Sequence, residues 1–204
     1  MENMLENLKK YRLVLASNSP RRKELLAGLD VDYEVRVLPG IDESYPDGLS
    51  GEEIPKYISR KKAEAYEAIM QPDELIITAD TIVWTDGKVL GKPKDEAEAK
   101  DMLRRLSGRT HQVITGVTLV TAGKKKTFAT VSEVTFDELS DEEIAYYVAH
   151  YRPLDKAGAY GIQEWIGYAA IERIDGSFFN VMGLPIQRVY TELNQFIQSI
   201  KNNP

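Results

Sequence analysis

Apolar strand-like segments alternate with amphipathic helical segments along this chain, and two turn signals interrupt the alternation. The helical period of 3.6 residues and the strand period of two call for different elements, so the fold must combine both. Asp86-Gly87 and Ala122-Gly123 are hairpin signals, which add antiparallel pairs to strands that otherwise stand between helices. This order predicts an α/β fold with a mixed sheet.

Residues that start or stop helices set the expected element boundaries. Ser19 and Pro20 fit an N-cap and a first helical position, and Gly108 fits a helix stop. Ser140 and Glu143 form a capping-box pattern. We expect strands at residues 13–16, 75–84, 110–121, 126–136 and 167–174. We expect one helix that begins at residue 20 and a second that carries the apolar face of Ile54, Ile58, Ala65 and Ile69 and ends at residues 71–72. Further helices are expected from about 95 to 108, from 140 to about 150, and from 185.

Length and charge limit the classes of protein that fit. A chain of 204 residues can bury roughly 70% of its unfolded surface, so we predict one domain over residues 1–204. The net charge of −6 argues against binding to a nucleic-acid backbone. The absence of cysteine excludes disulfides, thiolate metal sites and cysteine nucleophiles. Without a signal-like segment or a long apolar span, we expect a cytoplasmic protein with no membrane partner.

Two arginines occupy the first turn of the helix that begins at Pro20, where free backbone N–H groups and the helix dipole disfavour cations. Arg21 and Arg22 should each cost roughly 0.3 to 1 kcal/mol there, so we infer that an anion offsets them. With the hydroxyls of Ser17 and Ser19 they form a candidate phosphate cradle. The alternative is that both guanidinium groups extend into solvent or pair with acids elsewhere.

Asp80 interrupts an apolar strand on the face that also carries Ile76 and Ile82. A carboxylate there is costly unless it is paired, hydrogen-bonded or bound to a metal. Asp80 is therefore a candidate for chemistry, and the alternative is a structural aspartate that bonds nearby backbone. Lys62 follows Ile58 by four residues and falls on or beside the inward face of its helix, where a ligand-binding or a snorkelling lysine would fit.

Seven strings of sequence carry a family resemblance when they are taken together. LVLASNSPRRKELL, ITADTIV, LGKP and DKAGAYGIQ, with RKKAEAY, HQVITGV and FNVMGLP, resemble the Maf family of nucleoside triphosphate pyrophosphatases over residues 13–193. A lone SPRR is weak, whereas collinear motifs are highly specific. The resemblance implies a mixed sheet in two lobes around a deep cleft, similar to inosine triphosphate pyrophosphatases. It also implies a divalent metal cation, Mg²⁺ or Mn²⁺, and a homodimer in many members.

The resemblance also implies roles for individual residues. Asp80 becomes the proton acceptor for water or a ligand of the metal, and these two roles stay open. Lys62 and Lys92 complete the catalytic set by balancing the charge of the polyphosphate. The resemblance assigns substrate binding to Ser17, Arg21, Arg22, Thr81 and Gln163. Glu43, a loop acid, is a candidate metal ligand together with Asp80, and the alternative is that it is only a solvated turn residue.

The string AYGIQ looks like the dTTP/UTP branch rather than the branch that acts on 7-methyl-GTP. Gln163 offers a donor and an acceptor to a pyrimidine edge. The sequence then departs from the family pattern, because Glu164-Trp165-Ile166 replaces the usual glycine-containing run and adds one residue before Gly167. The alternative for this segment is that Trp165 shapes the pocket by stacking while Gln163 braces the loop.

The sequence therefore predicts hydrolysis of dTTP and UTP, and of modified pyrimidine nucleotides, to the monophosphate and pyrophosphate. Two other functions fit the same residues. One is a non-catalytic nucleotide sensor in cell-division control. The other is a pyrophosphatase of the same family with a different base preference.

Overall fold

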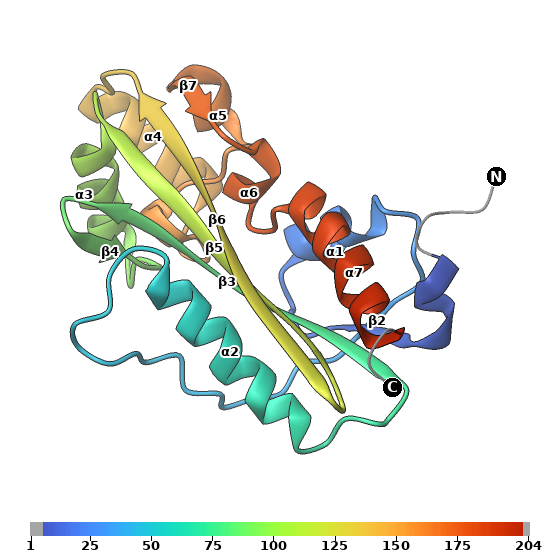
Figure 1. The fold of residues 1–204 in the computed structure, drawn as a ribbon. Helices are drawn as coiled ribbons and strands as arrows, with labels where there is room; N and C mark the ends of the chain where they lie inside the picture. Colours follow the sequence, from blue (N-terminus) through green and yellow to red (C-terminus); the bar gives the residue numbers. More distant parts are fainter. Residues whose placement is uncertain (1–5, 202–204) are drawn as a thin grey trace. The chain divides into compact units, whose positions relative to one another are not determined.

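The computed structural model describes the backbone of residues 6–201, which forms helices and strands in the predicted alternation (Figure 1). In chain order the elements are η1 (Glu6–Lys10), β1 (Arg12–Leu15), α1 (Pro20–Ala27), β2 (Glu34–Val35), α2 (Glu53–Glu67), β3 (Glu74–Thr85), β4 (Lys88–Leu90), α3 (Glu96–Leu106), β5 (Thr110–Thr121), β6 (Lys124–Phe136), α4 (Asp141–Tyr151), η2 (Ala157–Ala159), α5 (Trp165–Ala169), β7 (Ile171–Asp175), α6 (Phe178–Met182) and α7 (Ile186–Lys201).

The strands form a seven-stranded sheet in the order β2-β1-β3-β5-β6-β7, with β4 paired to β3. Strand β1 is parallel to both β2 and β3, whereas the β3–β4 and β6–β7 pairs are antiparallel. The predicted α/β class with a mixed sheet is therefore confirmed. Within residues 6–201, no helix is both long enough and apolar enough to cross a membrane.

The chain divides into two compact units. The first unit contains the residues up to Asp80, Thr115–Thr130 and the residues from Gly183 onward, and the second contains Thr81–Ile114 and Val131–Met182. The predicted single domain over residues 1–204 is not tested by this division and stays a prediction.

In the first unit, α2 packs on one face of the sheet while α1 and α7 lie on the other side of the strands (Figure 1). Val14, Ile76 and Val120 on the strands form a buried cluster with Ala63 and Tyr66 of α2. Because side chains alternate along β3, the face that carries Ile76 also carries the polar residues Thr78 and Asp80. The alternation predicted for this strand therefore directs Asp80 toward α2.

In the second unit, α3 and α4 lie side by side (Figure 1). Both helices begin at caps, because the Asp95 side chain accepts from the Glu98 backbone N–H and the Ser140–Glu143 capping box is complete. Asp86 and Gly87 both have positive φ, as the turn between β3 and β4 requires. These caps and this turn confirm the local signals in the sequence.

Two expected elements were wrong in part. Helix α2 ends at Glu67, so Ile69 lies beyond it and its side chain is 48% exposed. The strand expected at 167–174 begins only at Ile171, because Trp165–Ala169 form the short helix α5. A Cβ on Gly167 would lie 1.7 Å from the Ile162 carbonyl oxygen, a close approach that only glycine permits and that local propensity does not reveal.

A fully buried carboxylate ties the amino end of β3 to two arginines. Both Glu74 carboxylate oxygens accept from the Arg36 guanidinium, at 2.7 and 2.9 Å, and Arg12 donates at 3.0 Å. The Gln71 backbone N–H donates a further bond at 3.0 Å. The hydrogen bond from Arg36 is the main cause that lowers the pKa of Glu74 to about 2. The charged form is therefore the one that stabilises the fold.

We expect Glu74→Gln to lower the free energy of unfolding at pH 7 by roughly 2 to 4 kcal/mol, because it leaves two arginines without their buried partner. The folded pKa lies below the ordinary value near 4.5. This contribution is therefore complete above about pH 4.5 and is lost as pH falls toward 2. Urea unfolding curves measured between pH 7 and 3.5 should show that the difference in free energy of unfolding between the wild-type protein and Glu74→Gln becomes smaller as pH falls. Glu133→Gln, at an exposed carboxylate, is the control; a difference that does not change with pH would refute the account.

Candidate functional site

The start of α1 is built from two serines. Ser19 is the N-cap in extended backbone, and its hydroxyl accepts from the Arg22 backbone N–H at 3.5 Å. The buried Ser17 hydroxyl accepts from the Ser19 backbone N–H at 3.2 Å. Pro20 occupies the first helical turn, which contains no acidic residue. The predicted cap is confirmed, and the positive end of the helix dipole together with the two serine hydroxyls remains suited to an anion.

The Arg22 side chain is tied to backbone on neighbouring segments. Its Nε donates to the Gly183 carbonyl at 2.8 Å, and its Nη1 donates to the Ala79 carbonyl at 2.8 Å and to the Ser17 hydroxyl at 3.5 Å. Burial lowers the pKa of Arg22, and the negative charge of Asp80 opposes that shift. Arg22 therefore does not extend into solvent, and its guanidinium is fixed beside Ser17.

Arg21 lies next to this fixed guanidinium at the same helix start. Its side chain is partly exposed, and its positive charge is one of the causes that lower the pKa of Arg22. Two cations at the positive end of a helix repel each other as well as the dipole. The helix start therefore carries two positive charges and no acidic residue in its first turn.

Asp80 and Lys62 form an ion pair within the first unit. Lys62 Nζ lies 2.9 Å from Asp80 Oδ1 and 3.0 Å from Glu43 Oε1. The side chains of Asp80 and Lys62 are each 13% exposed, whereas that of Glu43 is 57% exposed. The carboxylate on the apolar strand is thus paired, as its burial demands, and its partner is the lysine predicted to face inward.

Strand and helix spacing explain why these two side chains meet. The Thr78 hydroxyl donates to the Ser59 carbonyl at 2.6 Å, which fixes α2 against β3. Asp80 is two residues further along the strand, and Lys62 is three residues further along the helix. The step along the strand is about 7 Å and the step along the helix is about 4.5 Å. The long lysine side chain spans the difference between these two distances.

The donor set fits a hard divalent cation whose remaining ligands come from a substrate. Asp80 and Glu43 converge on one ammonium group, so a cationic centre already suits the space between them. Residues 6–201 contain no group of three or more His, Cys, Asp or Glu side chains arranged to hold a metal. Mg²⁺ commonly binds through one or two carboxylates together with phosphate oxygens and water. The residues present match that mode and do not match an all-protein cage.

The other predicted site residues belong to the second unit. Thr81 follows Asp80 directly in the chain and is partly buried, while Lys92 is exposed after β4. The Gly158 backbone N–H donates to the Gly91 carbonyl at 3.0 Å, which ties the loop of Lys92 to the segment that leads to Gln163. Gly158 has φ +67, and a Cβ there would lie 2.7 Å from Val83.

Gln163 presents a buried acceptor that the protein does not satisfy. Its Oε1 is buried and has no hydrogen-bond partner. A buried polar atom without a partner is uncommon and costly, so it marks a place where a ligand donor is expected. The neighbouring Trp165 packs its ring against Tyr146 of α4, edge to face at 5.1 Å between centroids. The indole of Trp165 is therefore braced within the protein.

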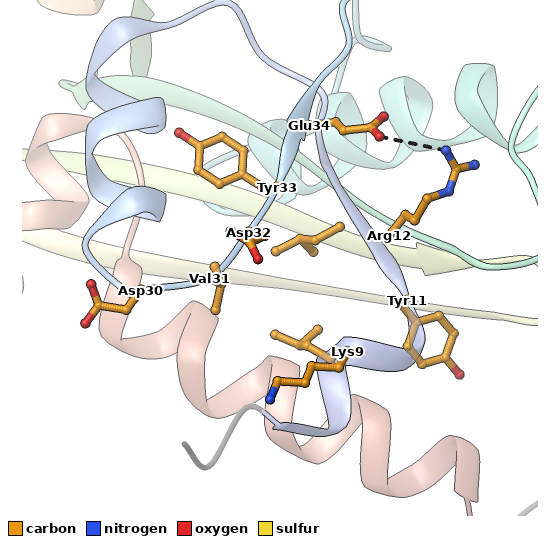
Figure 2. Close-up of a pocket in the computed structure, with 10 residues that line it drawn as sticks. Lys9, Tyr11, Arg12, Asp30, Val31, Asp32, Tyr33 and Glu34 are labelled. Carbon is orange, nitrogen blue, oxygen red and sulfur yellow. Dashed lines mark ion pairs between the residues drawn. The ribbon is translucent and has the colours of Figure 1, made fainter. Parts of the chain in front are cut away.

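A separate hollow of about 410 Å³ opens in the first unit. Figure 2 shows the side chains around it, with the Arg12–Glu34 ion pair at one side. Arg12 opens β1, whereas Ser17 follows the end of that strand. None of the predicted site residues lines the hollow. Its lining consists of Leu8, Lys9, Tyr11, Arg12, Leu13, Asp30, Val31, Asp32, Tyr33 and Glu34.

Comparison with known proteins places the chain in a family. The sequence model described as Maf-like protein matches residues 12–196. The chain belongs to the Maf-like protein family. The match extends over segments of both compact units.

Relatives of this Maf-like chain share most of its length. A protein of Phocaeicola vulgatus is 66% identical over 94% of this chain and 100% of the relative, and one of Bacteroides thetaiotaomicron is 65% identical over the same shares. A protein of Flavobacterium johnsoniae is 46% identical over 94% of this chain and 98% of the relative. All three are named dTTP/UTP pyrophosphatase. The solved structure of a HAM1 protein from Coxiella burnetii is similar with a TM-score of 0.46 at 17% identity, covering 91% of this chain and 99% of that chain.

Sequence reasoning did not identify the polar groups that hold the segment around Gln163 in this Maf-like chain. Tyr147 of α4 and Lys156 both contact the Glu164 carboxylate. Glu164 stands where the sequence leaves the family pattern, and that departure was the available signal. Tyr147 lies in a helix whose aromatic residues look like ordinary core positions, so no signal in the sequence marked it.

Proposed function

We propose that this protein hydrolyses dTTP and UTP to the nucleoside monophosphate and pyrophosphate. The observation that carries the proposal is the buried Asp80 carboxylate held by Lys62, in the unit that also carries the serine and arginine cradle of α1. The names of relatives that are 62–66% identical, dTTP/UTP pyrophosphatase, support the choice of reaction and substrate.

The cradle at the start of α1 binds the triphosphate in this proposal. Arg22 is fixed by two backbone carbonyls, so its guanidinium charge is oriented before the substrate arrives. Ser17 adds a hydroxyl, and Arg21 adds positive charge at the same helix N-terminus. The exposed Lys92 supplies one more cation to the polyphosphate. Donors placed in advance stabilise the charge that develops on phosphate oxygens.

Asp80 is the proposed base that takes a proton from the attacking water. A carboxylate accepts that proton only if it is held within hydrogen-bond reach of the water. Lys62 holds Asp80 Oδ1, which leaves the other carboxylate oxygen to orient water. We assign to Lys62 a second role as a cation that neutralises the polyphosphate.

In its alternative role Asp80, together with Glu43 and phosphate oxygens, is proposed to hold a divalent cation, Mg²⁺ or Mn²⁺. This cation would neutralise charge on the phosphates. Glu43 lies in an exposed loop, which suits a ligand that binds the metal together with the substrate. A cytoplasmic location stays a prediction from the sequence, and a homodimer stays a prediction from the family resemblance.

Gln163 is proposed to recognise the base through the acceptor that the protein leaves without a partner. Uracil and thymine carry a donor at N3, and this N–H satisfies Gln163 Oε1. Cytosine carries an unprotonated nitrogen at the same position, so it leaves the acceptor buried and unpaired. Such a loss costs about 1 to 3 kcal/mol and therefore separates the pyrimidines. We assign to Thr81 a supporting contact with the substrate.

Steady-state kinetics over dTTP, UTP, dCTP, dATP and dGTP with Mg²⁺ test both the function and the base contact. We expect the highest kcat/KM for dTTP and UTP. Gln163→Ala should lower kcat/KM for these two by about 10- to 100-fold and change that for dCTP much less, because only the preferred bases lose a contact.

Two results would contradict this assignment. Nucleotide binding without turnover in the wild-type protein would favour a non-catalytic sensor. If Gln163→Ala keeps the wild-type ranking while Trp165→Ala changes it, the base is recognised by stacking on Trp165.

A further inference from the structure

A buried polar network holds the segment that carries Gln163. The Tyr147 hydroxyl of α4 donates a very short hydrogen bond to Glu164 Oε2 and accepts from the Gly161 backbone N–H at 3.0 Å. Lys156 Nζ lies 3.0 Å from Glu164 Oε1. One hydroxyl, one carboxylate and one ammonium thus clamp both sides of Gln163, at Gly161 and at Glu164.

The network is buried, so its bonds are not readily exchanged for water. Tyr147 is fully buried and Lys156 is nearly so, while the Glu164 side chain is 19% exposed. Burial raises the pKa of the Tyr147 hydroxyl, which therefore stays protonated and keeps donating to Glu164. A satisfied polar network in a low-dielectric environment resists deformation. Gln163 is thereby attached to a rigid part of the second unit.

Close packing leaves the segment little room to shift. A Cβ on Gly161 would lie 2.9 Å from both Glu164 Cδ and Lys156 Cε, so the two charged side chains press directly on this glycine. Ala159, two residues earlier, has φ +59, a left-handed conformation that non-glycine residues rarely adopt. Such a conformation persists where surrounding contacts determine it.

A second anchor holds the same segment from β5. The Tyr160 hydroxyl and His111 Nε2 are 2.7 Å apart, and both residues are buried. Burial lowers the pKa of His111 to about 4, so the imidazole is neutral near pH 7. This anchor fixes Tyr160. The Tyr147 network then orients the next three residues, 161–163.

We propose that Tyr147 and Glu164 are positioning residues that set the base selectivity of this enzyme by fixing Gln163. The proposal rests on the proposed function, in which Gln163 Oε1 accepts from N3–H of uracil or thymine. An acceptor penalises cytosine only if it cannot turn aside, because a mobile amide would swing its own N–H group toward the cytosine nitrogen. Rigid support of Gln163 is therefore needed for its hydrogen bond to discriminate uracil and thymine from cytosine.

The test compares Tyr147→Phe with Tyr151→Phe. Both variants remove one hydroxyl from α4, and Tyr151 stacks on Tyr147 at 5.1 Å between ring centroids and is 38% exposed. We expect Tyr147→Phe to reduce the ratio of kcat/KM for dTTP to that for dCTP by about tenfold, with kcat for dCTP nearly unchanged. Tyr151→Phe should keep the wild-type ratio. A general loss of stability would lower both substrates alike and leave the ratio in place.

A double-mutant cycle separates action through Gln163 from other effects. In a Gln163→Ala background, Tyr147→Phe should change the ratio by less than about twofold, because the group that it positions is gone. Glu164→Gln provides a second variant should Tyr147→Phe fail to fold, and it should also reduce the ratio. An unchanged ratio in the folded variants, or full additivity in the cycle, overturns the proposal. A wild-type protein without preference for dTTP over dCTP would instead overturn the assignment of base recognition to Gln163, on which this proposal rests.

Discussion

Asp80→Asn is expected to reduce kcat for dTTP by about 10²- to 10⁴-fold, the range that loss of a positioned base produces. Asparagine has almost the same shape, but it cannot take a proton from water, and it removes the charged partner of Lys62 at 2.9 Å. The hydrogen bonds of Ser17, Ser19 and Arg22 in the cradle of α1 do not involve the Asp80 side chain. Binding of dTTP should therefore remain measurable by calorimetry in the folded variant.

The chain offers a matched control for this substitution. Asp42 pairs with Lys61 at 2.7 Å, just as Asp80 pairs with the next lysine of the same helix, but its carboxylate is exposed. Asp42→Asn should leave kcat within about twofold, since an exposed ion pair contributes little. If Asp80→Asn folds and keeps more than about a tenth of the wild-type kcat, Asp80 is not the base.

Gly116→Ala is expected to have the largest effect on stability. A Cβ at this position of β5 would lie 2.3 Å from the carbonyl carbon and oxygen of Pro55 and 2.5 Å from the Lys56 nitrogen, all of them backbone atoms. Helix α2 would have to move away from the sheet, so we expect a loss of at least about 3 kcal/mol in the free energy of unfolding. Urea denaturation with kcat measured in parallel tests this.

The same shift should impair chemistry, because α2 carries Lys62. Where Gly116→Ala remains folded, kcat for dTTP should fall along with stability, since the contact between Lys62 and Asp80 depends on the position of the helix. Gly123→Ala is the control, because a Cβ there meets nothing within 4 Å. A near-neutral Gly116→Ala would mean that the close contact between α2 and β5 is not needed.

The sequence predicted those parts of the fold that depend on local rules. The Ser19 cap, the first-turn Pro20 and the capping box at Ser140 follow from backbone groups that need partners at helix ends. The sequence placed Asp80 on an apolar strand face and Lys62 on or beside an inward helical face, each with a structural alternative, and it did not predict that the two side chains pair. Local periodicity therefore marked these two residues individually as candidates.

Hydrophobic periodicity did not predict contacts between residues that are far apart in the sequence. Residues 167–169 of α5 were expected to lie in a strand, and the close approach of Gly167 to the Ile162 carbonyl explains the turn that the structure has there. The carbonyl partners of Arg22 come from residues far along the chain, so its fixed position was not predictable. The roles assigned to Thr81, Lys92 and Gln163 stay proposals, because they depend on how a substrate binds.

Product analysis tests the central claim most directly. Wild-type protein is incubated with dTTP and Mg²⁺, and dTMP, dTDP, pyrophosphate and phosphate are quantified by anion-exchange chromatography and ³¹P NMR. The account predicts dTMP and pyrophosphate in equal amounts, with neither formed by Asp80→Asn over the same time. Formation of dTDP with phosphate, or no turnover of dTTP by the wild-type protein, would contradict it.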